Sequence, residues 1–232
     1  MNKKNWINEK KKIWDVEKCD NYDQGIGEYA KARDTKIITE LLKGEKGKLL
    51  DIPCGSGRFT EAMQKIGFEV ISADYSEDMI SSTQKKYNTP SVRADIYNLP
   101  FKDKSINNIM VIRLIFHYPE PREIIRELKR VTKKDGVIIL NTLNKYSIRW
   151  PVESVLKLVK GKKKGSIWLA SMKEFTKLIE EEGLKVEKIK SAYILPTRAY
   201  NYLPKIIIRL VDLVEKIFPN QLKVVTFWKI RT

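Results

Sequence analysis

The stretch Lys48–Thr60, reading KLLDIPCGSGRFT, constrains the fold more than any other part of the 232-residue chain. Apolar residues lead into Asp51, a tight Gly55-Ser56-Gly57 loop follows, and an amphipathic segment begins behind the loop. This order is typical of a buried strand, a glycine turn that lets a ligand approach the backbone, and a helix N-terminus. The stretch therefore predicts the first strand–loop–helix unit of a ligand-binding sheet.

Strand and helix patterns alternate with short connections as far as residue 140. Strands are expected at Lys48–Pro53, Phe68–Asp74, Ser91–Ala94, Ile106–Leu114 and Val137–Leu140. Helices are expected at Asn21–Leu42, Arg58–Ile66, Glu77–Tyr87 and Glu120–Val131, with a short helix within residues 1–20. Such alternation predicts a Rossmann-like, doubly wound α/β sheet with helices on both faces.

The alternation loosens after residue 140. A lysine-rich amphipathic helix is expected at 152–160, and a capping box predicts a second helix at Ser171–Glu182. The last expected elements are a strand at Leu184–Ala192, a helix at Leu203–Phe218 and a strand at Val224–Ile230. No linker divides the chain, so a single domain is predicted.

Lysine and arginine outnumber acidic residues by 45 to 29, which gives a net charge of +16. This excess favours an anionic partner, although lysines dispersed over solvated faces would explain it equally well. Cys19 and Cys54 form neither a disulfide framework nor a zinc site. We find no apolar signal-peptide core and no apolar run near the ~18 residues of a transmembrane helix, so a cytoplasmic location is expected.

Three aspartates end three successive predicted strands. Asp51 directly precedes the glycine loop, where its charge would repel a pyrophosphate, and Thr60 stands where a dinucleotide fingerprint has its third glycine. Both features favour a ligand that carries positive charge and no phosphates. Asp74 is placed to accept hydrogen bonds from ribose hydroxyls, and Asp95 from an adenine amine. Each aspartate alone would more often be a turn residue, but together they favour a nucleoside site.

The chain resembles the class I S-adenosylmethionine-dependent methyltransferases, in particular the broad group that includes quinone-biosynthesis and other small-molecule methyltransferases. The residues that carry this resemblance are LLDIPCGSGRFT, ISADYSEDM, VRADIYNLPF, INNIMVIRLIFHY and ELKRVTKKDGVIIL. The resemblance implies a seven-stranded, mostly parallel sheet with an antiparallel last strand. It also implies S-adenosyl-L-methionine as cofactor, S-adenosyl-L-homocysteine as product, and no metal.

The resemblance further implies a role for each part of the chain. It assigns 1–47 to an N-terminal helical lid, 48–140 to the cofactor-binding core, and 141–232 to substrate-side inserts and the last two strands. The cofactor-binding residues that it implies are Asp51, Cys54, Gly55, Ser56 and Gly57 in the loop, Asp74, Tyr75 and Met79, Asp95 and Ile96, Arg113, and, in the lid, Tyr22, Tyr29 and Arg33.

Two residues after the fourth predicted strand are candidates for the catalytic step. Arg113 is expected in the crevice on the acceptor side, and His117, the only histidine, has a suitable intrinsic pKa for a general base. A loop histidine that bonds the backbone is the alternative for His117. Cys54 is interpreted as a packing residue beside the cofactor rather than a nucleophile.

The acceptor is less constrained than the cofactor. The Asn/Asp-Pro-Pro-aromatic tetrad of base-nitrogen methyltransferases is absent after the fourth strand, where Arg113-Leu114-Ile115-Phe116 stands. The broad apolar face of Leu203–Phe218 predicts core packing, with peripheral membrane contact as the alternative. Three functions stay open: a methyltransferase for a small, lipophilic acceptor, a methyltransferase acting on RNA or protein, and a non-catalytic cofactor-binding module.

Overall fold

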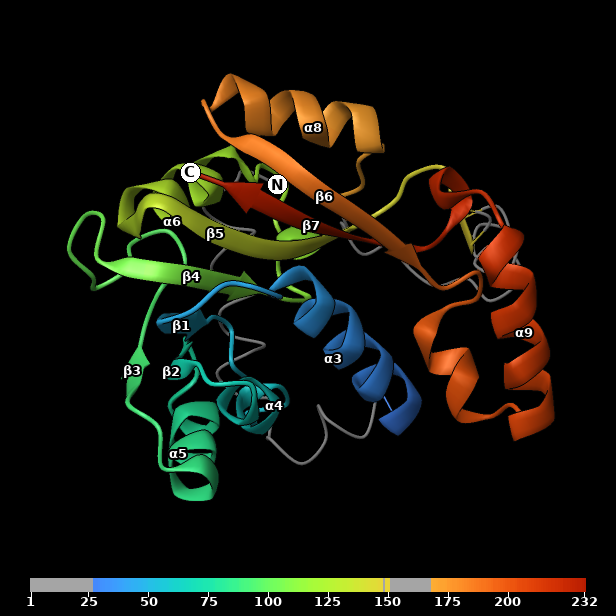
Figure 1. Cartoon of the computed structure of the whole chain (residues 1–232), viewed down its shortest axis with the longest axis horizontal. Coiled ribbons are helices and arrows are strands. Elements are labelled where there is room, and N and C mark those ends of the chain that lie inside the picture. The colour runs from blue at the N-terminus through green and yellow to red at the C-terminus, as the bar shows by residue number, and fades with distance from the viewer. Residues whose placement is uncertain (1–26, 148, 151–167) are drawn as a thin grey trace.

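The computed structural model describes residues 27–147, 149–150 and 168–232. The expected helices within 1–20 and at 152–160, and the candidate Tyr22, lie outside these residues. The described strands form one seven-stranded sheet in the order β3-β2-β1-β4-β5-β7-β6 (Figure 1). Their bounds are β1 Lys48–Asp51, β2 Glu69–Asp74, β3 Ser91–Arg93, β4 Ile106–Val111, β5 Thr132–Leu143, β6 Lys185–Ala192 and β7 Val225–Arg231.

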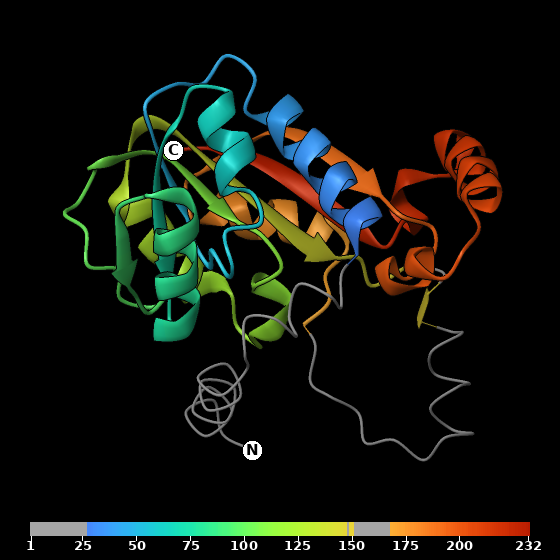
Figure 2. The ribbon, with the colours of Figure 1, turned by 90° about the horizontal axis from the view of Figure 1, so that it is seen from below.

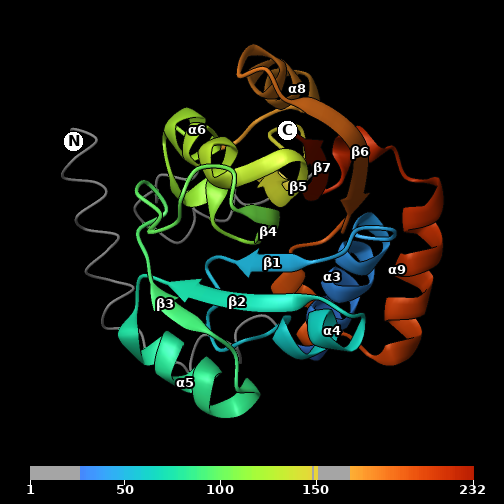
Figure 3. The ribbon, with the colours of Figure 1, turned by 60° about the vertical axis from the view of Figure 1, so that its left-hand side comes forward.

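The sheet is parallel except for its last strand in sequence. β1 pairs in parallel with β2 and β4, whereas β7 runs antiparallel to both β5 and β6. The chain therefore builds outward from β1 in two directions, and β4, β1, β2 and β3 follow one another across the sheet (Figure 3). The predicted fold class, including the reversed last strand, is confirmed. Such a reversal of strand order at β1 and β4 opens a crevice at the carboxyl ends of the strands.

Helices cover both faces of the sheet. The α-helices are α3 Glu28–Leu41, α4 Thr60–Lys65, α5 Glu77–Tyr87, α6 Arg122–Val131, α8 Met172–Glu181 and α9 Lys205–Ile217, and a 3₁₀ turn, η1, spans Ile115–His117. One core joins α6 and α8 to the sheet, with Leu128, Phe175 and Trp228 buried in it. A second core joins α3 and α4 to the opposite face. No helix in the described part of the chain is both long and apolar enough to cross a membrane.

Most predicted elements are confirmed, and α5 has the predicted bounds. The capping box that begins α8 is present, because Ser171 Oγ accepts from Glu174 N and the Glu174 carboxylate accepts from Ser171 N. β4 ends at Val111, earlier than predicted, because Arg113 adopts a left-handed φ of 63° ahead of η1. β5 begins at Thr132, earlier than predicted, because this residue pairs with Ile106.

The prediction of core packing for the apolar face of α9 is wrong. Ile206, Leu213 and Ile217 are exposed, and the one buried side chain of the helix is Glu215. α9 stands at the outer edge of the molecule beyond α3 (Figure 2). The helix is attached through the ion pairs of Asp212 and Glu215 and through Ile208 and Val211, which pack against the core, so the predicted apolar face points outward.

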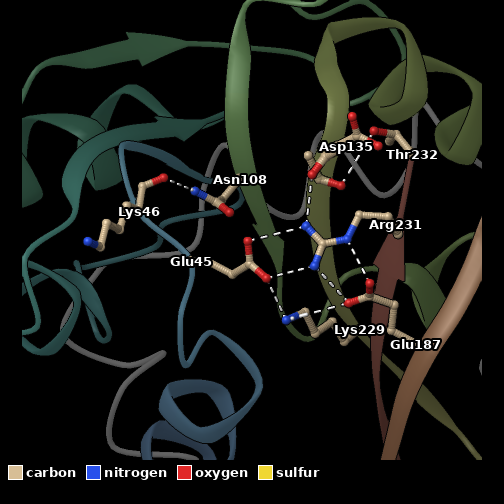
Figure 4. A network of polar contacts seen from close by, with 9 residues as sticks. Glu45, Lys46, Asn108, Asp135, Glu187, Lys229, Arg231 and Thr232 are labelled. Carbon is tan, nitrogen blue, oxygen red and sulfur yellow. Dashed lines mark hydrogen bonds and ion pairs between the residues drawn. The ribbon is translucent and has the colours of Figure 1, made fainter.

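A polar network fastens the end of β7 to the segment before β1 (Figure 4). Arg231 Nη2 lies 2.7 Å from Glu45 Oε1, and Arg231 Nε lies 2.8 Å from Glu187 Oε1. Lys229 Nζ lies 2.6 Å from Glu45 Oε1. Burial raises the pKa of Glu45, but the hydrogen bonds from Arg231 and Lys229 outweigh it, so the pKa is lowered overall. The network stabilises the paired ends of β5, β6 and β7 while their carboxylates are ionised.

Candidate functional site

The glycine loop connects β1 to α4 with two left-handed glycines. Gly55 has a φ of 54° and Gly57 a φ of 78°. A Cβ on Gly57 would lie 2.4 Å from the Tyr87 ring, so this position needs glycine for packing against α5. Gly55 and Ser56 line a pocket, whereas Gly57 does not. The two glycines therefore do different things: one permits close approach of a ligand, the other close packing of a helix.

Asp74, at the end of β2, holds the loop in place. Its Oδ2 accepts from Gly55 N at 2.9 Å and its Oδ1 from Ser76 N at 3.0 Å. Burial raises the pKa of Asp74 although these backbone hydrogen bonds lower it. Each carboxylate oxygen can accept a further hydrogen bond, so Asp74 is able to bind ligand hydroxyls while it anchors the loop.

Asp51, at the end of β1, carries a buried carboxylate directly before the glycine loop. Its side chain is 1% exposed, and among the described residues neither oxygen has a hydrogen-bond partner. Burial raises the pKa of Asp51 well above its usual range, repulsion from Asp74 adds to this, and Arg58 opposes it. A cationic group bound nearby would relieve both the burial penalty and the repulsion. The residues around Asp51 thus fit a ligand with positive charge.

The pocket lies at the carboxyl ends of β1, β2, β3 and β4. The segments that line it are 52–56 with Arg58 and Phe59, 74–76 with Met79, 94–96, and 112–114 with His117 and Tyr118. It brings together the following predicted site residues: Cys54, Gly55, Ser56, Asp74, Tyr75, Met79, Asp95, Ile96, Arg113 and His117. Asp51 and Gly57 are not among the lining residues, although Ile52 and Pro53, directly after Asp51, are.

The part of the pocket near β3 is apolar with one carboxylate at its rim. Met79 and Ile96 are buried there, and Asp95 is half-buried. Asp95 Oδ1 accepts from Tyr97 N at 3.2 Å, which orients the carboxylate. Apolar side chains beside an oriented acceptor suit a planar heterocycle with an amine, and Asp74 next to them suits a ribose. These residues and Asp51 fit a nucleoside that bears a cationic group.

Arg113 lines the pocket but directs its charge at a buried aspartate. Its Nη2 lies 2.7 Å from Oδ2 of Asp34 on α3, and its backbone N donates to Asn141 Oδ1 at 2.7 Å. Tyr193 donates its hydroxyl to Asp34 Oδ1 at 2.6 Å. A buried ion pair of this kind is costly to break. We therefore interpret Arg113 as a residue that ties the pocket wall to α3.

The remaining reactive side chains differ in burial. His117 is half-buried on η1, with its ring centroid 4.6 Å from that of Phe116, and it lines the pocket. Burial raises the pKa of the Cys54 thiol, as do the charges of Asp51 and Asp74, so the thiol stays neutral and is a poor nucleophile. Burial also raises the pKa of Tyr118.

The structure places Arg33 away from the pocket. Arg33 Nη1 lies 3.0 Å from Asp212 Oδ1 on α9, and its other terminal nitrogen pairs with Glu215. Tyr29 donates to Asp212 and is likewise absent from the pocket lining. Two acids on α9 bind these lid residues in this structure, and their contact with the cofactor stays a prediction. Nothing in the sequence predicted that α3 and α9 are in contact.

Sequence reasoning missed several apolar lining residues: Pro53, Phe59, Ile112 and Leu114. Phe59 directly follows the glycine loop, and Ile112 and Leu114 follow β4, so their positions after strand ends were a usable signal. Because these residues are apolar, the sequence pattern placed them on the packing faces of the predicted helices and strands rather than in the pocket.

Comparison with known proteins agrees with this geometry. Residues 50–140 match the family described as "Methyltransferase domain". Uncharacterized protein MJ1252 of Methanocaldococcus jannaschii is 31% identical over 68% of this chain and 61% of its own length. Ubiquinone biosynthesis O-methyltransferase of Actinobacillus pleuropneumoniae is 27% identical over 42% of this chain and 46% of its own length. The chain thus spans less than two thirds of either relative.

A solved structure shares the fold at low identity. Magnesium protoporphyrin IX methyltransferase from Synechocystis, solved with bound S-adenosylhomocysteine, superposes with a TM-score of 0.61 at 14% identity over 86% of this chain and 80% of that one. At this identity the likeness shows the fold alone. Residues 50–140 are thus a methyltransferase domain, and the described chain carries it on the seven-stranded sheet, with one antiparallel strand, that the class I S-adenosylmethionine-dependent methyltransferase fold has.

Proposed function

We propose that the protein transfers a methyl group from S-adenosyl-L-methionine to a small, lipophilic acceptor. The observation that carries the proposal is the buried Asp51 carboxylate near Asp74 at the glycine loop, which accepts no hydrogen bond from the described residues. Two carboxylates in a buried site repel each other, and a sulfonium or ammonium group would reverse that repulsion. The cytoplasm is the compartment we propose, on the sequence grounds given above.

We assign the cofactor-binding roles by position in the pocket. Asp74 would bind the ribose hydroxyls and Asp95 the adenine amine, with Tyr75, Met79 and Ile96 against the rings. Gly55 would hold the methionine part through its backbone, and Asp51 would act from behind it through charge. Residues 48–140 would thus carry the cofactor site, and residues 141–232 would complete the acceptor side.

When bound, the cofactor supplies a methyl group made electrophilic by its sulfonium. The chain has to hold the acceptor nucleophile in line with that carbon and exclude water, and positioning of this kind can lower a barrier by ~7–11 kcal/mol. Ile112 and Leu114 are buried in the pocket wall and would exclude water. His117 lines the same pocket and would accept a proton if the acceptor carries one.

The apolar wall supports a small, lipophilic acceptor. Phe59, Ile112 and Leu114 line the pocket, and the charge of Arg113 is paired with Asp34. A relative named above is a ubiquinone biosynthesis O-methyltransferase, which is consistent with an acceptor of this class. The net charge of +16 favours RNA as the second candidate acceptor.

Two experiments test the proposal. Calorimetric titration with S-adenosylmethionine should show binding that Asp95→Ala weakens, while NAD should not bind; absence of S-adenosylmethionine binding would refute it. Incubation of metabolite extract with methyl-labelled cofactor should then place label in the organic-soluble fraction. Label in RNA, together with RNA binding that weakens steeply as salt rises, would favour the second candidate instead.

A further inference from the structure

α9 carries an exposed apolar surface, which we call the α9 apolar face. It comprises Ile206, Ile207, Leu210, Leu213, Val214 and Ile217. Ile206 is 61% exposed and Ile217 is 86% exposed. Tyr202, just before the helix, is also 86% exposed. At helical spacing these six residues share one broad side of a helix ~20 Å long. Large apolar side chains gathered on one exposed helix side mark an interaction surface.

The polar attachment of α9 explains why this face points outward. Asp212 and Glu215 both bind Arg33 of α3, and Asp212 also accepts from Tyr29. Glu215 Oε1 additionally accepts from Tyr193 N at 3.0 Å. These contacts hold the acidic side of the helix against the body. The helix is therefore fixed with its apolar side toward the surroundings.

Both acids of α9 are paired with Arg33. Glu215 is buried, and Asp212, whose side chain is 38% exposed, has its charge offset by that ion pair. The remaining charged residues, Lys205, Arg209 and Lys216, are exposed and form a row along the helix beside the α9 apolar face. The surface thus combines apolar and positively charged groups, which complements an anionic lipid surface.

We propose that α9 docks the protein on an anionic membrane surface. The helix would lie in the plane of the interface, with the α9 apolar face in the boundary between headgroups and acyl chains and the basic row among anionic headgroups. A second copy of the chain fits less well, because a symmetric contact through this face would bring two basic rows together without acids to pair them. The proposal does not rest on the methyltransferase activity.

Flotation with vesicles tests the apolar contribution. The protein, without cofactor, should bind vesicles of phosphatidylcholine and phosphatidylglycerol at 3:1 and bind pure phosphatidylcholine weakly. Leu210→Glu with Leu213→Glu should reduce partitioning roughly 10-fold or more, because two side chains no longer enter the interface. The matched control is Ile66→Glu with Ile189→Glu, which replaces two exposed apolar residues elsewhere, 44% and 38% exposed, and should bind as wild type.

Charge substitution tests the basic row. Lys205→Gln, Arg209→Gln and Lys216→Gln together should weaken binding to the 3:1 vesicles, at ~5-fold per residue. The matched control removes the same charge from three exposed lysines elsewhere, Lys43, Lys85 and Lys102. Equal loss of vesicle binding in both triple variants would show that binding depends on net charge alone and would overturn the proposal.

Two further outcomes would also overturn it. Unchanged binding of the Leu210→Glu, Leu213→Glu variant would show that α9 does not enter the interface. A wild-type dimer in light scattering that this variant converts to monomer would assign the face to a second copy. Unchanged far-UV circular dichroism and thermal midpoint would confirm that each variant is folded. Because cofactor binding is measured separately, failure here leaves the proposed activity standing.

Discussion

Replacing two buried aspartates by asparagine, one at a time, should change the free energy of unfolding in opposite directions. Asp34 and Asp51 are 0% and 1% exposed, but only Asp34 has polar partners for its carboxylate among the described residues: Arg113 at 2.7 Å and Tyr193 at 2.6 Å. Asp34→Asn removes the charge that Arg113 needs. Asp51→Asn removes a charge that accepts no hydrogen bond from the described residues and that Arg58 offsets only in part.

The expected changes in the free energy of unfolding follow from these contacts. Breaking a buried ion pair costs ~3–5 kcal/mol, and we expect the lower end for Asp34→Asn because the Arg113 side chain retains 12% exposure. Removing an unpartnered buried charge should stabilise the cofactor-free protein by ~1–3 kcal/mol. The same Asp51→Asn change should weaken S-adenosylmethionine binding ~10-fold or more, because it removes the negative charge behind the methionine part, and ~1.4 kcal/mol corresponds to tenfold.

Urea unfolding without cofactor, from pH 5 to pH 8, is the measurement. The pKa of Asp51 is raised in the folded state, so the folded protein binds this proton more tightly than the unfolded chain does. Wild-type stability should therefore rise, relative to Asp51→Asn, as pH falls through the folded-state pKa. If Asp51→Asn lowers stability at pH 7 as Asp34→Asn does, the carboxylate has favourable contacts and our reasoning is wrong.

Three further outcomes are expected. Gly57→Ala should lower the free energy of unfolding by ~1–3 kcal/mol, measured by urea unfolding, because its Cβ would lie 2.4 Å from the tyrosine ring at the end of α5. Arg231→Gln should destabilise at pH 7 but progressively less toward pH 3; Arg231 lowers the pKa values of Glu45 and Glu187, so this stabilisation is lost as pH falls through them. His117→Gln should keep cofactor affinity in calorimetry and reduce turnover ~10²-fold once an acceptor is known; unchanged turnover would remove the base assignment.

The sequence predicted the sheet well because its strands end at recognisable points. The apolar runs of β1, β2 and β3 lead into Asp51, Asp74 and Asp95, and the first turn of α5 carries two acids. β5 was predicted too short because Lys133, Lys134 and Asp135 look like a loop, although Thr132 already pairs with β4. The local sequence around Thr132 gives no information on Ile106, its partner in β4, which lies 26 residues earlier.

The orientation of α9 shows a different limit. Periodicity separated the apolar side of the helix from the polar side, but which side faces the body depends on the partner. Here the partner is Arg33. Its hydrogen bonds to Asp212 and Glu215 join residues that are 179 and 182 positions apart in the sequence. The same pairing holds Arg33 away from the pocket lining. One tertiary contact thus determines both the orientation of α9 and the position of Arg33.

Helix α3 connects the α9 surface to the pocket through two consecutive residues. Arg33 binds the acids of α9, and Asp34 binds Arg113 of the pocket wall. Tyr193 contacts both sides of this connection, because its hydroxyl donates to Asp34 and its backbone N donates to Glu215. A change in the position of α9 would therefore act on α3 and on the pocket wall through direct polar contacts. If α9 binds a membrane as proposed, an acceptor dissolved in that membrane would meet the pocket beside the helix that holds Arg113.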